Sequence, residues 1–288
     1  MNTRGSSTAL LIAATLVFLA ESKGRRDLVD PEAVAIGNWL LRNYSSSTRL
    51  MHRLIRSGCF RLAATTLERL TVPGILEYFA LRKRAISRLA NDAFDAGITQ
   101  LVVLGAGYDG LTSRVVRDRD SIAIWEVDQP ATQSWKRRAV NETGLSSKRL
   151  HFVGSDLSEG FPALGAGFSS SQPVFCVAEG LLMYLPEQRV IDLFRRLRQL
   201  SPDKCRIAFT FLEPQPDGHI DFSYQSRGVR AWLAAKREPF VWGIRRQEIG
   251  TFLESLGFRQ LAITPEITKE LDRRSVGEFL VLAQTNDV

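Results

Sequence analysis

Residues 101–110, LVVLGAGYDG, contain the pattern that most clearly indicates chemistry. An apolar run leads into Gly105, and Gly105, Gly107 and Gly110 together satisfy G-x-G-x-x-G. Glycines at the carboxyl end of a first strand let the backbone approach a ligand closely. Asp128 follows about 20 residues later, where a carboxylate can accept hydrogen bonds from a ribose diol. A tight turn at the glycines and a helix cap at Asp128 explain the same residues without a ligand, so the pattern alone does not identify a cofactor.

Two later carboxylates narrow the choice of cofactor. Asp156 follows a third apolar run and can accept from the exocyclic amine of an adenine, and Glu179 follows a fourth and could meet an ammonium group. With Asp109 and Asp128, an acidic residue stands at or just past four consecutive strand ends. Such an edge suits a cationic ligand and repels a pyrophosphate. We therefore expect S-adenosylmethionine rather than NAD.

Seven short apolar runs alternate with helical patterns from residue 100 onward. They lie at 100–104, 121–127, 149–153, 173–177, 206–212, 258–264 and 277–283. The clearest helical patterns between them are at 187–200 and 246–256, and residues 1–97 show helical spacing throughout. This order predicts an α/β fold with a doubly wound, mostly parallel, seven-stranded sheet. Because the connection at 265–276 is short for a parallel crossover, an antiparallel final hairpin is expected.

The composition excludes several classes of protein. The chain has 288 residues, of which 44% are hydrophobic and 24% charged, so it can build a large core and is not globally disordered. It has 3 Cys and 3 His, scattered along the chain. A disulfide scaffold is therefore not expected, and neither is a metal site. No 20-residue apolar helical span is present, which argues against an integral membrane protein.

The net charge of +7 is concentrated in the N-terminal third. Residues 1–90 contain 14 Lys and Arg against 6 Asp and Glu, a surplus of +8, and the remaining 198 residues have a balance of −1. Such a surface can attract an anionic substrate, an acidic protein partner or a membrane surface, or it can simply be solvated. We expect no nucleic-acid partner, and we consider an acidic carrier protein as a candidate partner.

Residues 8–20, TALLIAATLVFLA, form an uncharged stretch of 13 residues after Arg4. The stretch is similar to the core of a signal peptide but is too short to span a bilayer. The odd number of cysteines and a cofactor that is made inside cells favour a buried helix in a cytoplasmic protein.

Several pieces of the sequence resemble the leucine carboxyl methyltransferase-like family of S-adenosylmethionine-dependent methyltransferases, which includes actinobacterial proteins and polyketide O-methyltransferases. The matching pieces, in order, are TALLIAA, LRKRAI, LGAGYDG, EVDQP, SDL, AEGLLMYLP, REPFVWGI and FLESLGF. They extend from about residue 8 to residue 258, and the EVDQP and AEGLLMYLP pair is the specific part. The resemblance implies a class I, Rossmann-like core at 98–288, an N-terminal helical cap at 1–97 and a lid insert at 213–243.

The resemblance also implies roles for individual residues in binding S-adenosylmethionine. Arg82 would hold the cofactor carboxylate, in bidentate fashion, and the backbone of Gly105 would line the cofactor. Asp128 would bind the ribose, Asp156 and Leu157 would bind the adenine, and Glu179 would bind the methionine end. The family often has Ser-Lys-Thr-Ala near its N-terminus, but this chain reads Ser6-Ser7-Thr8-Ala9 and lacks that lysine.

The substrate is expected beside Tyr184, which follows the fourth strand, and under the insert. Aromatic side chains on an insert above the strand ends can form an apolar lid, although they can also simply pack the insert onto the body. The candidates that we single out for substrate binding are Tyr184, Phe222, Tyr224, Trp232 and Trp242.

The patterns and the resemblance together imply O-methylation of a carboxylate or hydroxyl on a small molecule, such as a polyketide-type or carrier-bound one. No catalytic residue is assigned: a carboxylate acceptor needs no general base, whereas a phenol or alcohol would benefit from one. Methylation of a protein C-terminal carboxylate is the alternative within the same chemistry. An NAD-dependent oxidoreductase and a non-catalytic binding protein are the alternatives of other classes.

Overall fold

A seven-stranded sheet forms the centre of the molecule in the computed structural model, which describes residues 5–165, 167–202, 204–269 and 276–286. The strands are β1 (Gln100–Leu104), β2 (Ala123–Asp128), β3 (Leu150–Gly154), β4 (Val174–Ala178), β5 (Cys205–Leu212), β6 (Phe258–Ile263) and β7 (Glu278–Thr285). Their order across the sheet is β3-β2-β1-β4-β5-β7-β6. β1 to β5 are parallel, and β7 is antiparallel to both β5 and β6. The predicted α/β fold and its antiparallel final hairpin are thus confirmed.

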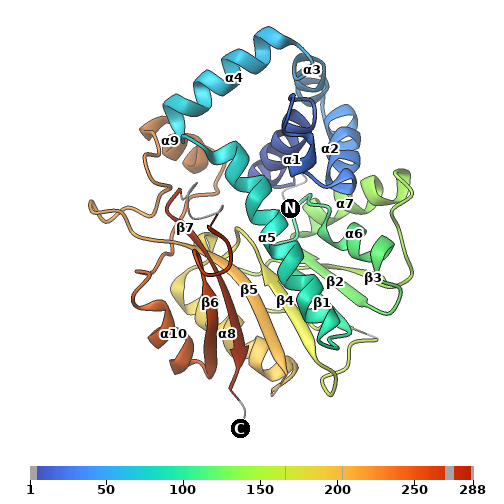
Figure 1. Ribbon diagram of the computed structural model, residues 1–288, viewed down its shortest axis with the longest axis vertical. Coiled ribbons are helices and arrows are strands. Elements are labelled where there is room, and N and C mark those ends of the chain that lie inside the picture. The colour runs from blue at the N-terminus through green and yellow to red at the C-terminus, as the bar shows by residue number, and fades with distance from the viewer. Residues whose placement is uncertain (1–4, 166, 203, 270–275, 287–288) are drawn as a thin grey trace.

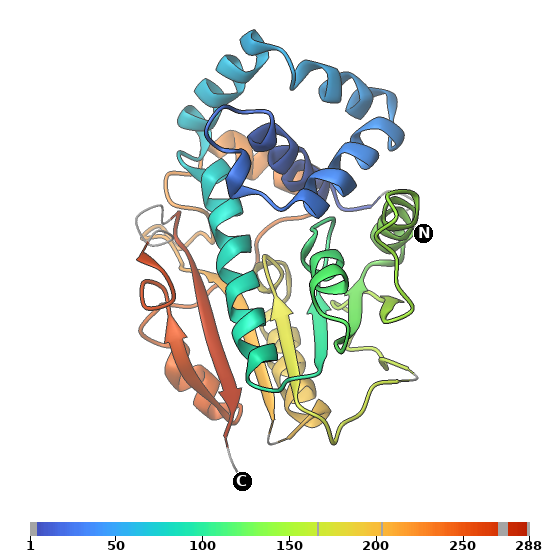
Figure 2. The same cartoon turned by 45° about the vertical axis from the view of Figure 1, so that its right-hand side comes forward.

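Helices cover both faces of the sheet (Figures 1 and 2). On β1, Leu101 and Val103 enter one core with α5 (Ile75–Asp95), α6 (Leu111–Asp118) and α7 (Pro130–Glu142). Val102 and Leu104 enter the other core with α8 (Glu187–Leu200) and α10 (Ile249–Ser255). This alternation follows from the two-residue period of a strand, and burial on both faces explains why the strands read as continuous apolar runs.

The N-terminal region is helical, and its helices differ in how they are packed. They are α1 (Ser7–Ala20), α2 (Pro31–Asn43), α3 (Ser46–Leu54), α4 (Gly58–Thr71) and α5. α1 is the buried helix expected for the apolar stretch, and it packs against α2 and α5 in a third core. α5 lies along the sheet, so this part of the region shares a core with the strands. The division into domains at residue 97 stays a prediction.

The insert at residues 213–243 leaves the sheet after β5 and returns before α10. It contains α9 (Arg227–Ala235), and Figure 1 shows it reaching toward the helices above the strand ends. Ser226 N donates to Thr71 O at the end of α4, and Ser7 and Thr8 of α1 contact Glu238 near the end of the insert. The insert and the N-terminal helices therefore meet above the carboxyl edge of the sheet. Among the described residues, no helix has the length and apolar character needed to cross a bilayer.

Candidate active site

The glycine turn after β1 is held tightly against the neighbouring strand ends. Gly105 has φ of +62° and Gly107 has φ of +51°, a region that residues with a side chain rarely adopt. A Cβ at Gly105 would lie 3.0 Å from the Leu181 side chain, which follows β4. The turn is thus specified by its glycines, as the motif predicted.

Asp128 at the end of β2 accepts two backbone hydrogen bonds. Its Oδ2 accepts from Gly107 N at 2.6 Å and its Oδ1 accepts from Gln129 N at 2.6 Å. Burial raises the pKa of its carboxyl, and the two N–H donors oppose that effect. Because each carboxylate oxygen can accept more than one hydrogen bond, Asp128 retains the capacity to accept from a pair of hydroxyl groups.

Asp156 and Leu157 form the next part of the edge, after β3. Asp156 Oδ1 accepts from Ser158 N at 2.9 Å and from Ser158 Oγ at 2.7 Å. Its Oδ2 accepts from Gln129 Nε2 at 3.3 Å. Leu157 is buried and belongs to the core that also contains Leu104. A polar acceptor beside an apolar wall suits a planar base with an exocyclic amine.

Arg82 of α5 is buried among carboxylates. Its Nε donates to Glu179 Oε1 at 2.8 Å and its Nη1 donates to Glu278 Oε2 at 2.5 Å. Burial alone would lower the pKa of the guanidinium, but the two carboxylates outweigh it and raise that pKa. The bidentate grip predicted for Arg82 needs revision, because protein carboxylates already engage two of its three nitrogens. Its Nη2 faces Gly180, where a Cβ would lie 3.4 Å away.

Lysines neutralise part of the acidic strand edge. Lys83 Nζ lies 3.1 Å from Glu179 Oε1 and 3.3 Å from Asp109 Oδ2. Lys136 Nζ lies 3.7 Å from Asp109 Oδ1 and 2.8 Å from Glu126 Oε1. Burial would raise the pKa of the Asp109 carboxyl, but the two lysines outweigh it and lower that pKa. The acidic edge expected from the four strand ends is therefore partly neutralised at Asp109 and Glu179. That expectation rested on strand ends alone, and the lysines come from helices.

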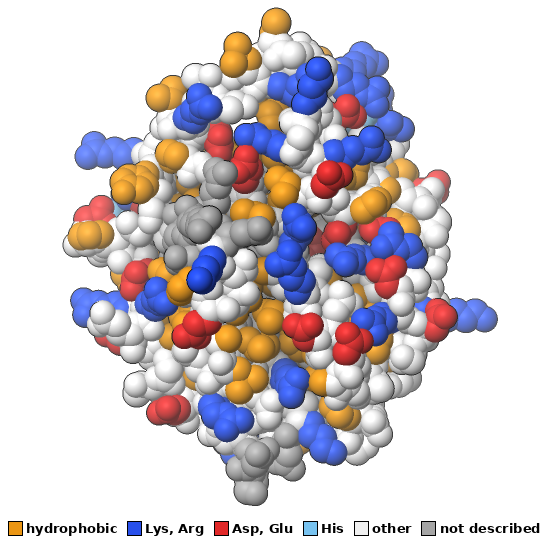
Figure 3. Space-filling view, viewed as in Figure 1, with side chains coloured by type: hydrophobic (Ala, Val, Ile, Leu, Met, Phe, Trp, Pro, Cys, Tyr) orange, Lys and Arg blue, Asp and Glu red, His pale blue; other side chains and the backbone are white. Residues whose placement is uncertain are grey.

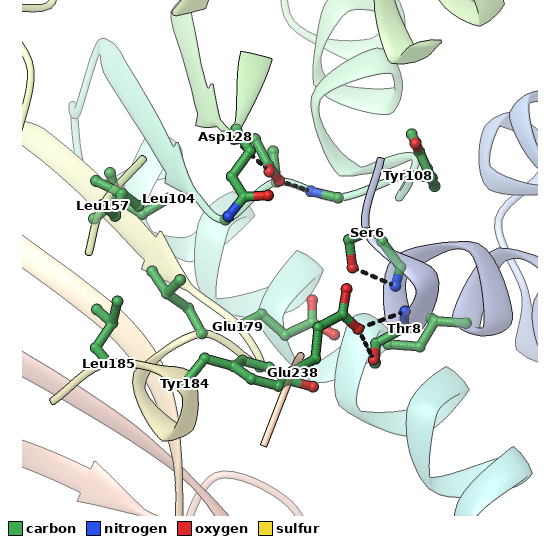
Figure 4. A pocket seen from close by; sticks show the side chains of 18 of the residues that line it. Ser6, Thr8, Leu104, Tyr108, Asp128, Leu157, Glu179, Tyr184, Leu185 and Glu238 are labelled. Atoms are coloured by element: carbon green, nitrogen blue, oxygen red, sulfur yellow. Dashed lines mark hydrogen bonds between the residues drawn. The ribbon is translucent and has the colours of Figure 1, made fainter. Parts of the chain in front are cut away.

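A cavity of about 450 Å³ lies at this edge. All six residues predicted to bind the cofactor line it, and they come from α5 and from the ends of β1 to β4. The six are Arg82, Gly105, Asp128, Asp156, Leu157 and Glu179. Figure 4 shows the two sides of this space, with Asp128 and Leu157 on one and Thr8 and Glu238 on the other.

The second wall of the cavity consists of the start of α1 and the end of the insert. Ser6, Thr8 and Ala9 line it from α1, and residues 236–239 line it from the insert. Ser7 N and Thr8 N each donate to the Glu238 carboxylate at 2.9 Å, and Thr8 Oγ1 donates to it at 2.5 Å. The sequence patterns do not single out Glu238 or Lys83. The signals that could have found them are the REPF piece of the insert and the position directly after Arg82.

Tyr184 is the one predicted substrate residue among those that line the cavity within the described chain. Trp242 is buried beside Phe252, with ring centroids 5.8 Å apart, and Phe222 packs on Phe240 at 5.4 Å. Tyr224 is 88% exposed, and Trp232 is half-buried on α9. The lid of Phe222, Tyr224, Trp232 and Trp242 was thus wrong as a cavity lining. Phe222 and Trp242 pack the insert onto the body. The insert lines the cavity with Lys236, Arg237, Glu238, Pro239 and Val241 instead.

Comparison with known proteins identifies the family. The sequence model of the family described as leucine carboxyl methyltransferase matches residues 36–198. A protein of Mycolicibacterium vanbaalenii is 34% identical over 170 residues, which are 58% of this chain and 53% of the relative. One of Mycobacterium avium is 28% identical over 206 residues, which are 67% of this chain and 65% of the relative. Both are named "Putative S-adenosyl-L-methionine-dependent methyltransferase". The chain thus spans about half to two thirds of the length of these relatives.

Solved structures agree with the fold. A Thermobifida fusca protein described as a "putative methyltransferase" superposes with a TM-score of 0.57 at 15% identity, covering 79% of this chain and 88% of that one. The 1,6-didemethyltoxoflavin-N1-methyltransferase of Burkholderia thailandensis gives 0.50 at 14% identity, covering 83% and 90%. At these identities the likeness concerns the fold alone. The cofactor in the names of the curated relatives is the one that the sequence predicted. Because the family match covers more than half of the chain, this protein belongs to the leucine carboxyl methyltransferase family.

Proposed function

We propose that this protein binds S-adenosylmethionine and transfers its methyl group to an oxygen atom of a small molecule. The observation that carries the proposal is the convergence of the six predicted cofactor residues on one cavity, although they are spread from residue 82 to residue 179. Convergence of this kind at the carboxyl edge of a doubly wound sheet is typical of cofactor sites.

The residues present fit this cofactor. Asp128 offers two acceptor oxygens to a ribose diol, and Asp156 with Leu157 offers an acceptor beside an apolar wall to an adenine. Near Glu179, the Nη2 of Arg82 is the guanidinium nitrogen that no carboxylate of the described residues engages, and it can donate to a cofactor carboxylate. A dinucleotide would bring a pyrophosphate to the same edge. The Asp128 carboxylate there forms no salt bridge with a described residue, so its charge would repel the pyrophosphate.

The cavity can also support the transfer step. Bound S-adenosylmethionine supplies a methyl group on a positively charged sulfur, and the protein aligns the acceptor oxygen with it and excludes water. Thr8, Tyr184 and residues 236–239 close the second side of the cavity. This closure favours a small acceptor over the C-terminus of a folded protein.

Calorimetric titration with S-adenosylhomocysteine and, separately, NAD tests the cofactor. The wild-type protein should bind S-adenosylhomocysteine and not NAD. Asp128→Ala should weaken that binding by about 1–3 kcal/mol, because ribose hydroxyls lose their acceptor. Asp120→Ala is the matched control, because Asp120 is fully exposed. The Asp120→Ala protein should bind S-adenosylhomocysteine with the wild-type affinity. NAD binding, or native affinity in Asp128→Ala, would contradict the cofactor assignment.

Labelled methyl transfer tests the acceptor. The protein is incubated with methyl-labelled S-adenosylmethionine and either the small-molecule or the protein fraction of a cell extract. Label in the small-molecule fraction is the expected result. Label that stays on a protein C-terminal carboxylate, rather than on a small molecule released from a carrier, would favour the protein carboxyl methyltransferase instead.

A further inference from the structure

The start of α1 is an anion site that the protein fills with its own carboxylate. Ser6 caps the helix by accepting from Ala9 N at 3.0 Å. The two preceding N–H groups, of Ser7 and Thr8, donate to Glu238, which lies 230 residues or more away in the sequence. The first backbone donors of a helix attract negative charge, and here all three have partners within the chain.

This arrangement disfavours a carboxylate as the methyl acceptor on the α1 side of the cavity. An incoming carboxylate would find the α1 donors already used, and it would meet the charge of Glu238 in a partly desolvated space. Among the described residues, Glu238 has no salt bridge, whereas Glu179 and Asp109 are paired with cations. The neighbouring Lys236 and Arg237 also line the cavity, but both are exposed, so solvent screens their charge.

Glu238 also has capacity to accept a proton. Its Oε2 accepts from both Thr8 N and Thr8 Oγ1, and its Oε1 accepts from Ser7 N. A carboxylate oxygen can accept two hydrogen bonds, so Oε1 retains a free site. The other titratable groups near this carboxylate are Tyr184, Lys236 and Arg237 and, from the turn after β1, Tyr108. Burial raises the pKa of the Tyr184 phenol, so Tyr184 stays neutral.

We infer that the acceptor is a hydroxyl group and that Glu238 takes its proton. This inference rests on the proposed function and names its substrate class. The acceptor oxygen forms a bond to the methyl carbon, and the carbon–sulfur bond breaks with its electron pair left on the sulfur, which becomes neutral. The hydroxyl proton passes to Oε1 of Glu238 and then to solvent. Ser7 and Thr8 are positioning residues, because they hold the carboxylate through its other lone pairs.

The chemical stability of the labelled product tests the substrate class. Methyl ethers survive mild alkaline hydrolysis, whereas methyl esters release volatile labelled methanol. A base-stable product in the small-molecule fraction is expected. Volatile methanol would overturn the inference and leave the proposed methyltransferase function standing. The proposed function fails separately if the wild-type protein does not bind S-adenosylhomocysteine.

Variants of Glu238 test the proton transfer on the purified acceptor. Glu238→Gln should lower kcat by about 10²- to 10⁴-fold, the usual contribution of a general base. Its rate should recover as the pH approaches the pKa of the acceptor hydroxyl, since an ionised acceptor needs no base. Asp217→Asn, on the same insert but outside the cavity lining, should keep the wild-type rate at every pH. If Glu238→Gln is as active as the wild type, or slowed equally at all pH values, Glu238 is not the proton acceptor.

A structural defect in the Glu238 variant would show as lost cofactor affinity. S-adenosylhomocysteine should bind Glu238→Gln within about threefold of the wild type. Thr8→Val removes one hydrogen bond to Glu238 and keeps the carboxylate. It should reduce kcat less than Glu238→Gln does and should retain the wild-type pH profile. A Thr8→Val profile that matches Glu238→Gln would overturn the assignment of the proton to Glu238.

Discussion

α1 and α4 are helices of 14 residues in the same N-terminal region, yet they are used in opposite ways. Seven residues of α1 are buried, and its first turn lines the cavity. None of α4 is buried, and Leu62, Leu67 and Leu70 are 61–74% exposed. Figure 1 shows α1 packed above the sheet edge and α4 along the outer rim. The predicted cap is therefore not uniform, since one helix completes the site and the other forms surface.

The surface around α4 also differs in charge. Figure 3 shows hydrophobic side chains at the upper edge of the molecule, with Lys and Arg gathered beside them. α3 and α4 and the turn between them contain Arg49, Arg53, Arg56, Arg61 and Arg69 against Glu68. In α1 there is no charged residue. The surface around α4 is basic and apolar, whereas α1 is uncharged and largely buried. We therefore expect substitutions in these two helices to have different effects.

The largest expected contrast is in core packing. Leu19 of α1 is fully buried, so Leu19→Ala should lower the free energy of unfolding by about 2–5 kcal/mol. Leu67→Ala in α4 should change it by less than about 0.5 kcal/mol, because Leu67 is 61% exposed. Urea denaturation measures both. Equal losses would mean that α4 is covered in solution.

Substitution of two glycines by alanine should change the stability of the protein in opposite directions. A Cβ at Gly37 of α2 would lie 2.8 Å from Val17 Cγ2 of α1, so Gly37→Ala should cost about 1–3 kcal/mol of overpacking. Gly58 at the start of α4 has no atom within 4 Å of such a Cβ, so Gly58→Ala should stabilise by up to about 1 kcal/mol through helix propensity. Thermal unfolding distinguishes the two signs. A destabilised Gly58→Ala protein would contradict the expected difference in packing between α4 and the helices α1 and α2.

The helix caps provide a matched pair of serines. Ser6 accepts from Ala9 N, so Ser6→Ala should cost about 0.5–2 kcal/mol of stability. Because Ser6 lines the cavity, its loss should also weaken binding of S-adenosylhomocysteine. Ser57 precedes α4 but makes no side-chain cap hydrogen bond, so Ser57→Ala should change neither quantity. Chemical denaturation and calorimetry together measure the pair, and a cofactor effect from Ser57 would contradict the separation of the two helices.

The smallest effect on the fold is expected from charge reversal on the outer face. Changing Arg53, Arg56 and Arg61 to Glu should leave cofactor affinity unchanged, because none of these side chains lines the cavity.

We propose that this face recruits an acidic carrier protein that bears the substrate. In that case kcat/KM for a carrier-bound acceptor should fall with added salt and fall again in the reversed variant, while the free acceptor is unaffected. Equal activity on both forms at every salt concentration would leave the face as ordinary surface.

The fold could be predicted from the sequence because strand and helix patterns are local. The predicted run at 100–104 matches β1 and the helical pattern at 187–200 matches α8, residue for residue. The short connection at 265–276 was enough to predict an antiparallel β7. Boundaries elsewhere moved by up to three residues, since helix and strand ends depend on caps and neighbouring strands.

The strand-end half of the site was also determined by the sequence. Glycines at a strand end and carboxylates at the next strand ends must share one edge of a parallel sheet, so Gly105, Asp128 and Asp156 could be placed together from spacing alone. The tertiary structure decided the other half. Glu238 meets Thr8 across 230 residues, and Arg82 meets Glu278 across 196. No periodicity relates such pairs, because helix packing and the path of the insert bring them together.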